Sequence, residues 1–148
     1  MIASREYIAG ILSGCYQLNT VNKGDDMRQK LAAGNWKMNG TQSALSELAH
    51  LDARNVHCGI VIFPPAQLLI PAVAHAKGIS IGAQNCHTAD HGAHTGDLSA
   101  SMIADTGARY VIIGHSERRQ DHFETDALVN AKVRAAQNAG LTPIICVG

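Results

Sequence analysis

Short apolar runs recur along this chain, and stretches of mixed polarity separate them. The run Gly59–Phe63, with the sequence GIVIF, is rich in β-branched residues and ends at Pro64 and Pro65, so it predicts a buried strand. Further strands are predicted over Leu31–Met38, where the strand runs into a loop, and over Ile79–Ala83, Arg109–Ile113 and Pro143–Val147. Proline is tolerated as the first residue of a strand, so Pro143 is compatible with the last of these.

The intervening stretches have helical spacing. Thr41–Leu51 has a candidate N-cap at its first residue and places Leu45, Leu48 and Leu51 on one face. Helices are also predicted over Gln67–Lys77 with Gly78 as its stop, Leu98–Thr106, the short segment Ser116–Arg119, and Asp126–Ala139 with Gly140 as its stop. Strands and helices that alternate in repeats of about thirty residues or fewer predict an α/β fold with a parallel sheet.

Two architectures fit this alternation, a doubly wound open sheet and a (β/α)8 barrel. Neither GxGxxG after the first strand nor GxxxxGK[ST] occurs, so nucleotide-binding folds lose their best evidence. Polar residues instead follow several strands, namely Asn35 and Lys37, Gln84 and Asn85, and His115 and Glu117. Barrel enzymes collect their catalytic residues at the carboxyl ends of strands, and this favours the barrel.

Composition narrows the class of protein. The chain has 148 residues, 46% hydrophobic and 16% charged, which suits one folded domain. Its net charge of zero gives no reason to expect a nucleic-acid or membrane partner. Cys15, Cys58, Cys86 and Cys146 form no CxxC pair, which favours buried thiols in a reducing cytoplasm. No apolar run approaches the length of a membrane span, so a cytoplasmic location is expected.

The first 26 residues differ from the rest and are expected to form a disordered extension. Their apolar run Tyr7–Leu12 is too short for a convincing signal peptide. A polar segment, Lys23–Asp26, directly precedes Met27, and we interpret Met27 as the true start. Deleting Met1–Asp26 from a full-length version should leave turnover and melting temperature unchanged. A clear loss of either quantity would identify the extension as part of the folded structure.

Several motifs occur in one order: AAGNWKMNG, GAQN followed by GAHTGDLS, YVIIGHSERR, the ETD that opens the last predicted helix, and PIICVG. Together they resemble the triosephosphate isomerase family over residues 27–148, and GNWKMNG with GHSERR is highly specific to it. The resemblance implies the (β/α)8 TIM barrel. It also implies that the barrel is incomplete here, with about five strands and four helices of the eight-fold repeat.

The resemblance also implies a reaction and a set of site residues. Enzymes of the family interconvert dihydroxyacetone phosphate and D-glyceraldehyde 3-phosphate through an enediolate, without a cofactor or a metal. His115 matches the family's electrophilic histidine, held neutral at a helix N-terminus. Lys37 matches its active-site cation, Asn35 its substrate-binding asparagine, and Glu117 a carboxylate that positions the lysine. Cys146 matches a cysteine near the site, and it is interpreted as a packing residue rather than a nucleophile.

Taken singly, these residues have simpler interpretations. A histidine at a strand end is more often a solvated loop residue. Lys37 alone would be a surface lysine and Asn35 a turn former. Glu117 alone would be an acidic residue favoured by the helix dipole. Only the motifs that contain them raise these residues to site candidates.

The loop His87–Asp97 contains three histidines beside other metal-ligand residue types. The spacing does not match the usual structural zinc patterns, so no metal site is expected, and a solvated loop is the simpler alternative. The resemblance implies a third interpretation, a loop that projects into the partner of a homodimer. Thr95 would then support the partner's site. The family more often has an aromatic residue where His94 stands and glutamate where Asp97 stands.

The resemblance also implies that part of the family's catalytic machinery is not included in these 148 residues. In the family, the catalytic base is a glutamate that follows the segment matched here, and so do the lid and the phosphate-binding amides. Five strands cannot close an eight-stranded barrel, because strand number, tilt and shear are linked. Two hypotheses remain open: the N-terminal part of a normal isomerase, or a catalytically inactive fragment that is a real product.

Overall fold

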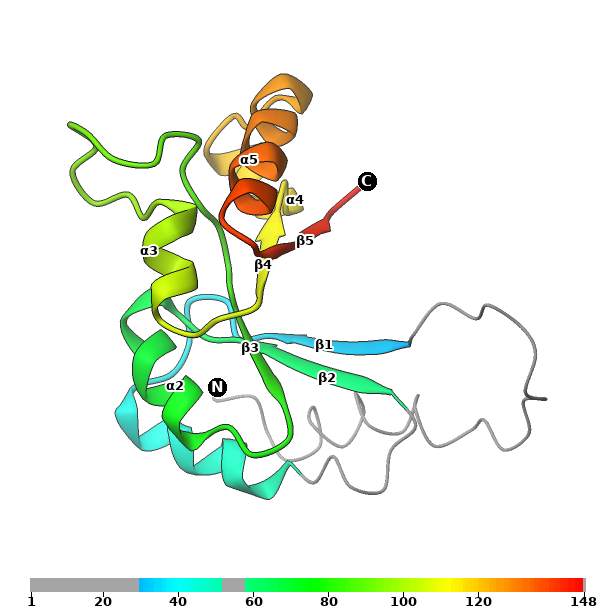
Figure 1. Ribbon diagram of the computed structural model, residues 1–148. Helices are drawn as coiled ribbons and strands as arrows, with labels where there is room; N and C mark the ends of the chain where they lie inside the picture. The colour runs from blue at the N-terminus through cyan, green and yellow to red at the C-terminus, as the bar shows by residue number, and fades with distance from the viewer. Residues whose placement is uncertain (1–29, 52–57, 148) are drawn as a thin grey trace.

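The computed structural model describes residues 30–51 and 58–147, and the predicted extension Met1–Asp26 lies outside them. A parallel five-stranded sheet contains β1 (Leu31–Asn35), β2 (Gly59–Phe63), β3 (Ser80–Ala83), β4 (Tyr110–Ile113) and β5 (Thr142–Ile145). The strands pair in the order β1-β2-β3-β4-β5 and the sheet curls (Figure 1). A doubly wound sheet reverses its strand order at a switch point, whereas a barrel keeps sequential order. The fold is therefore part of a (β/α) barrel, as predicted.

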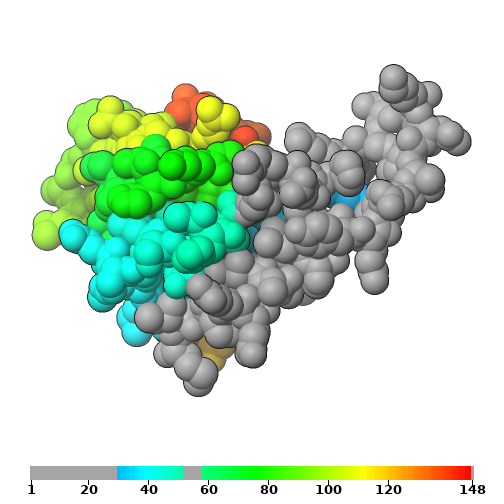
Figure 2. All heavy atoms as spheres, turned by 90° about the horizontal axis from the view of Figure 1, so that it is seen from below, coloured from blue at the N-terminus to red at the C-terminus, as the bar shows by residue number. Residues whose placement is uncertain are grey.

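Helical segments connect the strands. They are η1 (Gln42–His50), η3 (Ala66–Leu68), α2 (Leu69–His75), α3 (Ala100–Asp105), α4 (Ser116–Asp121) and α5 (Asp126–Asn138). Figure 1 shows η1, α2, α3 and α5 along the outer side of the curved sheet. In the space-filling view from below, the cyan η1 lies beside the green α2 (Figure 2).

The sheet buries different residues on its two faces, as alternation along a strand requires. The larger apolar cluster packs the outer face of the sheet, including Ile60, Ile62 and Val111, against the helices. A smaller cluster of Val61, Phe63 and Ile112 occupies the inner face. Gly82 leaves room for this inner packing, because a Cβ at that position would lie 2.3 Å from the ring of Phe63.

Some element ends differ from the predictions. Residues 42–50 form a 3₁₀ helix, and Thr41 makes no side-chain cap. Its hydroxyl instead bonds Ser43 Oγ at 3.0 Å, and Ser46 Oγ donates to the Ser43 carbonyl, so local side-chain bonds compete with the α-helical pattern. The helix α2 ends at His75, before the predicted stop at Gly78. The strand β5 begins at Thr142, which makes Pro143 its second residue.

The cysteines are not all thiols. Cys86 is a buried free thiol and Cys146 a partly buried one, but Cys58 is disulfide-bonded. The expectation that all four cysteines are free thiols is therefore wrong for Cys58. Cysteines that are far apart in sequence can still form a disulfide when the fold brings them together. Among the described residues, the helices are too short or too polar to cross a membrane.

Candidate active site

The carboxyl ends of the strands carry an ion pair between residues 80 apart in sequence. Lys37 follows β1, Glu117 lies in α4 after β4, and Lys37 Nζ donates to Glu117 Oε1 at 2.6 Å. Strands β1 and β4 are three spacings apart, about 14 Å in a flat sheet at ~4.8 Å per spacing. The curl of the sheet brings the strand ends closer, so side chains from separated strands meet at this edge.

The backbone at Lys37 has an unusual conformation that its neighbours hold in place. Its φ is +55°, in the left-handed region that costs a non-glycine residue about 1–3 kcal/mol. The Lys37 N–H donates to Asn35 Oδ1 at 2.8 Å. Gln84 Nε2 donates to the carbonyls of Lys37 at 2.8 Å and Phe63 at 2.9 Å. Asn35 and Gln84 therefore fix the direction in which the lysine leaves the strand end.

His115 lies at the N-cap of α4, where the sequence predicts it. Its Nδ1 accepts the Glu117 backbone N–H at 3.3 Å and lies 3.6 Å from Glu117 Oε2. A nitrogen that accepts a hydrogen bond carries no proton, so this geometry corresponds to the tautomer with the proton on Nε2. The ring is mostly buried, at 23% side-chain exposure, and in this tautomer Nε2 is its one donor nitrogen.

The Glu117 carboxylate lies between the side chains of Lys37 and His115. The hydrogen bond from Lys37 holds the pKa of the Glu117 carboxyl below its ordinary value, against a smaller opposing effect of desolvation. The charge of Lys37 acts in the same direction as the hydrogen bond. A carboxylate that stays ionised keeps the lysine ammonium oriented at the carboxyl edge of the sheet.

Two other predicted residues lie apart from this group. Thr95 is exposed on the loop between β3 and α3. No hydrogen bond or ion pair recorded among residues 30–51 and 58–147 joins it to Asn35, Lys37 or His115. Burial raises the pKa of the Cys146 thiol, and Arg119 lowers it by less. A thiol with a raised pKa is a poor nucleophile, which agrees with a packing role.

Sequence reasoning missed a buried polar cluster beneath this edge. Glu124 Oε1 accepts from Lys132 Nζ at 2.6 Å and from Arg118 Nε at 2.5 Å, and Lys132 also donates to Asn85 Oδ1 at 2.8 Å. The side chains of Glu124 and Lys132 are 1% and 6% exposed. Helical spacing could have revealed the cluster, because Lys132 shares the buried face of α5 with Val129 and Ala136.

The pKa of the Glu124 carboxyl is set by two opposing effects. Burial alone raises the pKa. The hydrogen bonds from Lys132 and Arg118 and the positive charges of these two residues lower the pKa, and together they outweigh the effect of burial. The net shift is downward, so the carboxylate is ionised inside the protein. Its second oxygen, Oε2, is buried and has no partner among the described residues. The cluster therefore depends on charge pairing at Oε1.

The sequential parallel sheet and the polar groups at its carboxyl edge are typical of the class of (β/α) barrel proteins. Comparison with known proteins gives the family. The family model for triosephosphate isomerase matches residues 30–148. The triosephosphate isomerase of Ruegeria sp. (strain TM1040) is 56% identical over 124 residues, which cover 82% of this chain and 50% of that protein.

Other relatives agree. The triosephosphate isomerase of Dinoroseobacter shibae is 56% identical over 126 residues, covering 82% of this chain and 51% of that protein. The crystal structure of triosephosphate isomerase from Bartonella henselae superposes with a TM-score of 0.78 at 48% identity, covering 82% of this chain and 52% of that one. This chain belongs to the triosephosphate isomerase family, and it spans about half the length of the curated relatives that it matches.

Proposed function

We propose that this chain supplies the electrophilic half of a triose-phosphate isomerase site, an intramolecular oxidoreductase of glycolysis and gluconeogenesis. The observation that carries the proposal is the convergence of Lys37, His115 and Glu117 at one edge of the sheet, with Lys37 Nζ 2.6 Å from Glu117 Oε1. A neutral donor, a cation and an ionised carboxylate come together there. The substrate class is a small phosphorylated aldose or ketose, and no cofactor is needed.

The proposed chemistry follows from where charge develops. Moving a proton between adjacent carbons of dihydroxyacetone phosphate produces an enediolate, whose oxygens become negative in the transition state. His115 would donate from Nε2 to those oxygens, and the Lys37 ammonium would stabilise the same charge and the phosphate. Asn35 holds the Lys37 backbone through its Oδ1 and would present its amide nitrogen to the substrate. Glu117 orients the lysine.

The base that removes the carbon-bound proton is proposed to lie in the part of the full-length relatives that this chain does not span. The chain as given would then be catalytically inactive by itself, since a positioned base is typically worth ~10²–10⁴-fold. This is the second candidate function, and the half-length coverage of the relatives supports it. Both proposals assign the same roles to Lys37 and His115.

Further proposals concern assembly and location. We propose that the full-length protein is a cytoplasmic homodimer in which Thr95 reaches the neighbouring site, with no nucleic-acid or membrane partner. The exposure of Thr95 on a long loop supports this, as does the balanced net charge of the chain. The side chains of Met38 and Phe123 are exposed, and such a dimer would offer apolar side chains of this kind a buried position.

A complementation assay separates the two candidate functions. The purified 148-residue chain should fail a coupled triose-phosphate isomerase assay. Adding a separately made second half of a relative should restore some turnover, if the two parts close one barrel. Turnover by the chain alone that a His115→Ala substitution abolishes would contradict the assignment of the base to the other half.

A further inference from the structure

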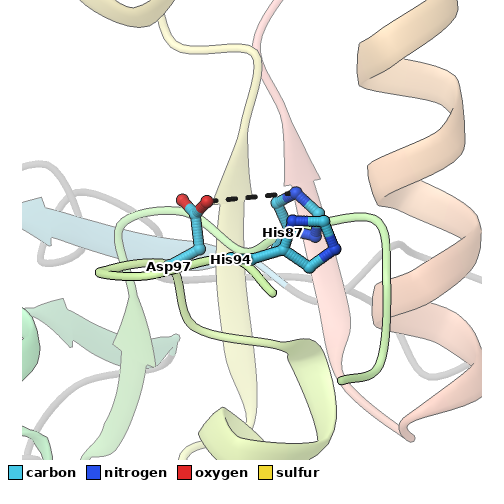
Figure 3. A group of neighbouring side chains, drawn as sticks. All are labelled: His87, His94 and Asp97. Carbon is cyan, nitrogen blue, oxygen red and sulfur yellow. Dashed lines mark ion pairs between the residues drawn. The ribbon is translucent and has the colours of Figure 1, made fainter. Parts of the chain in front are cut away.

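The loop between β3 and α3 brings three ligand-type side chains together outside the site described above. His87, His94 and Asp97 each offer one nitrogen or oxygen atom within 4.8 Å of the others. His87 Nε2 lies 3.9 Å from Asp97 Oδ2, and the two imidazole rings pack with centroids 4.0 Å apart. Figure 3 shows the Asp97 carboxylate facing the His87 ring, and the His94 ring packs against the His87 ring.

Backbone hydrogen bonds hold the three residues close. The His87 N–H donates to the Leu98 carbonyl at 2.8 Å, which places Asp97 opposite His87. The Asp97 N–H donates to the His94 carbonyl at 3.0 Å and closes a tight turn. Gly96 has φ +92° at the third position of that turn, a conformation that favours glycine. The loop is therefore preorganised, and little chain entropy opposes binding of a ligand to all three residues.

Neighbouring ligand-type residues do not join the group. Cys86 is fully buried, its Sγ lies 3.9 Å from the Lys132 carbonyl, and burial raises its pKa to about 11 despite the opposing charge of Lys132. Asp90 and His91 pair with each other, Oδ2 to Nδ1, at 3.7 Å. The donor set is thus two imidazoles and one carboxylate.

We propose that His87, His94 and Asp97 bind a divalent transition-metal ion, with Zn²⁺ as the best match. Imidazole nitrogens with one carboxylate are ligands that Zn²⁺ accepts and that Mg²⁺ and Ca²⁺, which prefer oxygen, do not favour. Ligand atoms ~2.1 Å from a tetrahedral ion lie ~3.4 Å apart, so the side chains must close by about 1 Å. His87 and Asp97 have room to do so, at 24% and 50% side-chain exposure.

Metal binding has a specific consequence for His87. Its Nδ1 accepts the Ala89 N–H at 3.0 Å, so the ring proton is on Nε2 in the metal-free protein. Coordination through Nε2 moves that proton to Nδ1, where it faces the Ala89 N–H and breaks the hydrogen bond. The Ala89 amide therefore reports on metal binding. Thr95 lies between two of the ligands, so an occupied site also fixes the segment that carries it.

This proposal does not rest on the proposed isomerase activity, and its test needs no turnover. Zn²⁺ alone is titrated calorimetrically into the 148-residue chain and into two matched variants, His94→Gln and His91→Gln. The two variants carry the same substitution three positions apart in one loop. Only His94 is a proposed metal ligand, so His91→Gln is the control. We expect one saturable site, weakened at least about tenfold by His94→Gln and unchanged by His91→Gln.

A second readout avoids dependence on any variant. In the unsubstituted chain, Zn²⁺ should shift the Ala89 amide resonance and speed its hydrogen exchange, and Mg²⁺ should do neither. Asp97→Asn should remove both effects of Zn²⁺. The proposal is overturned if Zn²⁺ does not bind saturably, if the two histidine variants bind equally well, or if saturating Zn²⁺ leaves the Ala89 amide unchanged.

Discussion

Replacing Glu124 with alanine is expected to lower the free energy of unfolding by about 3–5 kcal/mol. The side chain is 1% exposed, and the substitution leaves Lys132, 6% exposed, without its buried counter-charge. Breaking a buried ion pair is costly because the remaining charge is desolvated and unpaired. Urea unfolding followed by fluorescence measures the effect, since Trp36 is the single tryptophan and is buried.

Two variants serve as controls for this loss. Asp126 pairs with Arg119 at 2.7 Å but is 93% exposed, so Asp126→Ala should have little effect because solvent screens the pair. The double variant Glu124→Leu, Lys132→Met removes both buried charges and should recover much of the stability lost in Glu124→Ala. Equal destabilisation by Glu124→Ala and Asp126→Ala would show that the buried cluster contributes no more to the free energy of unfolding than an exposed ion pair does.

The lowered pKa of Glu124 also predicts how the free energy of unfolding changes with pH. The folded protein favours the ionised carboxylate, so this stabilisation is fully present above the unfolded value of ~4.3 and is lost as pH falls through the lower folded value. The difference in unfolding free energy between the parent and Glu124→Gln should therefore shrink below about pH 4. A difference that grows on acidification would contradict the assigned charge state.

Replacing His115 with alanine should lower kcat by about 10²–10³-fold in a chimaera that completes the barrel. The chimaera joins residues 27–147 of this chain to the part of the Ruegeria sp. relative that the chain does not cover. The loss is expected because Nε2 is the proposed donor to the enediolate oxygens, and the ring is already fixed through Nδ1 by the Glu117 N–H at 3.3 Å.

The matched control for this substitution is His122→Ala. His122 ends the same helix, α4, and is exposed, so its removal should leave kcat unchanged. If both substitutions reduce kcat equally, the effect comes from the helix rather than from the His115 donor. Unfolding curves of both variants distinguish loss of stability from loss of chemistry.

The sequence predicted most of the fold because hydrophobic pattern and turn residues agree locally. The run GIVIF forms β2 at the predicted residues, and the strand order follows from the alternation with helices. Helix ends were less predictable, because they depend on side-chain hydrogen bonds such as Thr41 to Ser43 that no periodicity encodes. The disulfide at Cys58 was not predicted because it depends on contacts in space.

The site was predictable only where a motif marks it. GNWKMNG and GHSERR led to Asn35, Lys37, His115 and Glu117, and the structure brings Lys37, His115 and Glu117 together. The left-handed backbone of Lys37 and the two hydrogen bonds from Gln84 have no local sequence signal, since both come from the packing of separate strand ends. The buried Glu124–Lys132 pair was missed because charged residues are rarely expected in a core.

The most direct measurement of the central claim is the turnover of the unsubstituted chimaera in a coupled triose-phosphate isomerase assay. The claim is that Asn35, Lys37 and His115 form a working half of the site. We predict a kcat/KM within about tenfold of that of the intact Ruegeria sp. enzyme, a difference of ~1.4 kcal/mol in transition-state stabilisation. A chimaera that folds with a cooperative unfolding transition but shows no turnover would contradict it.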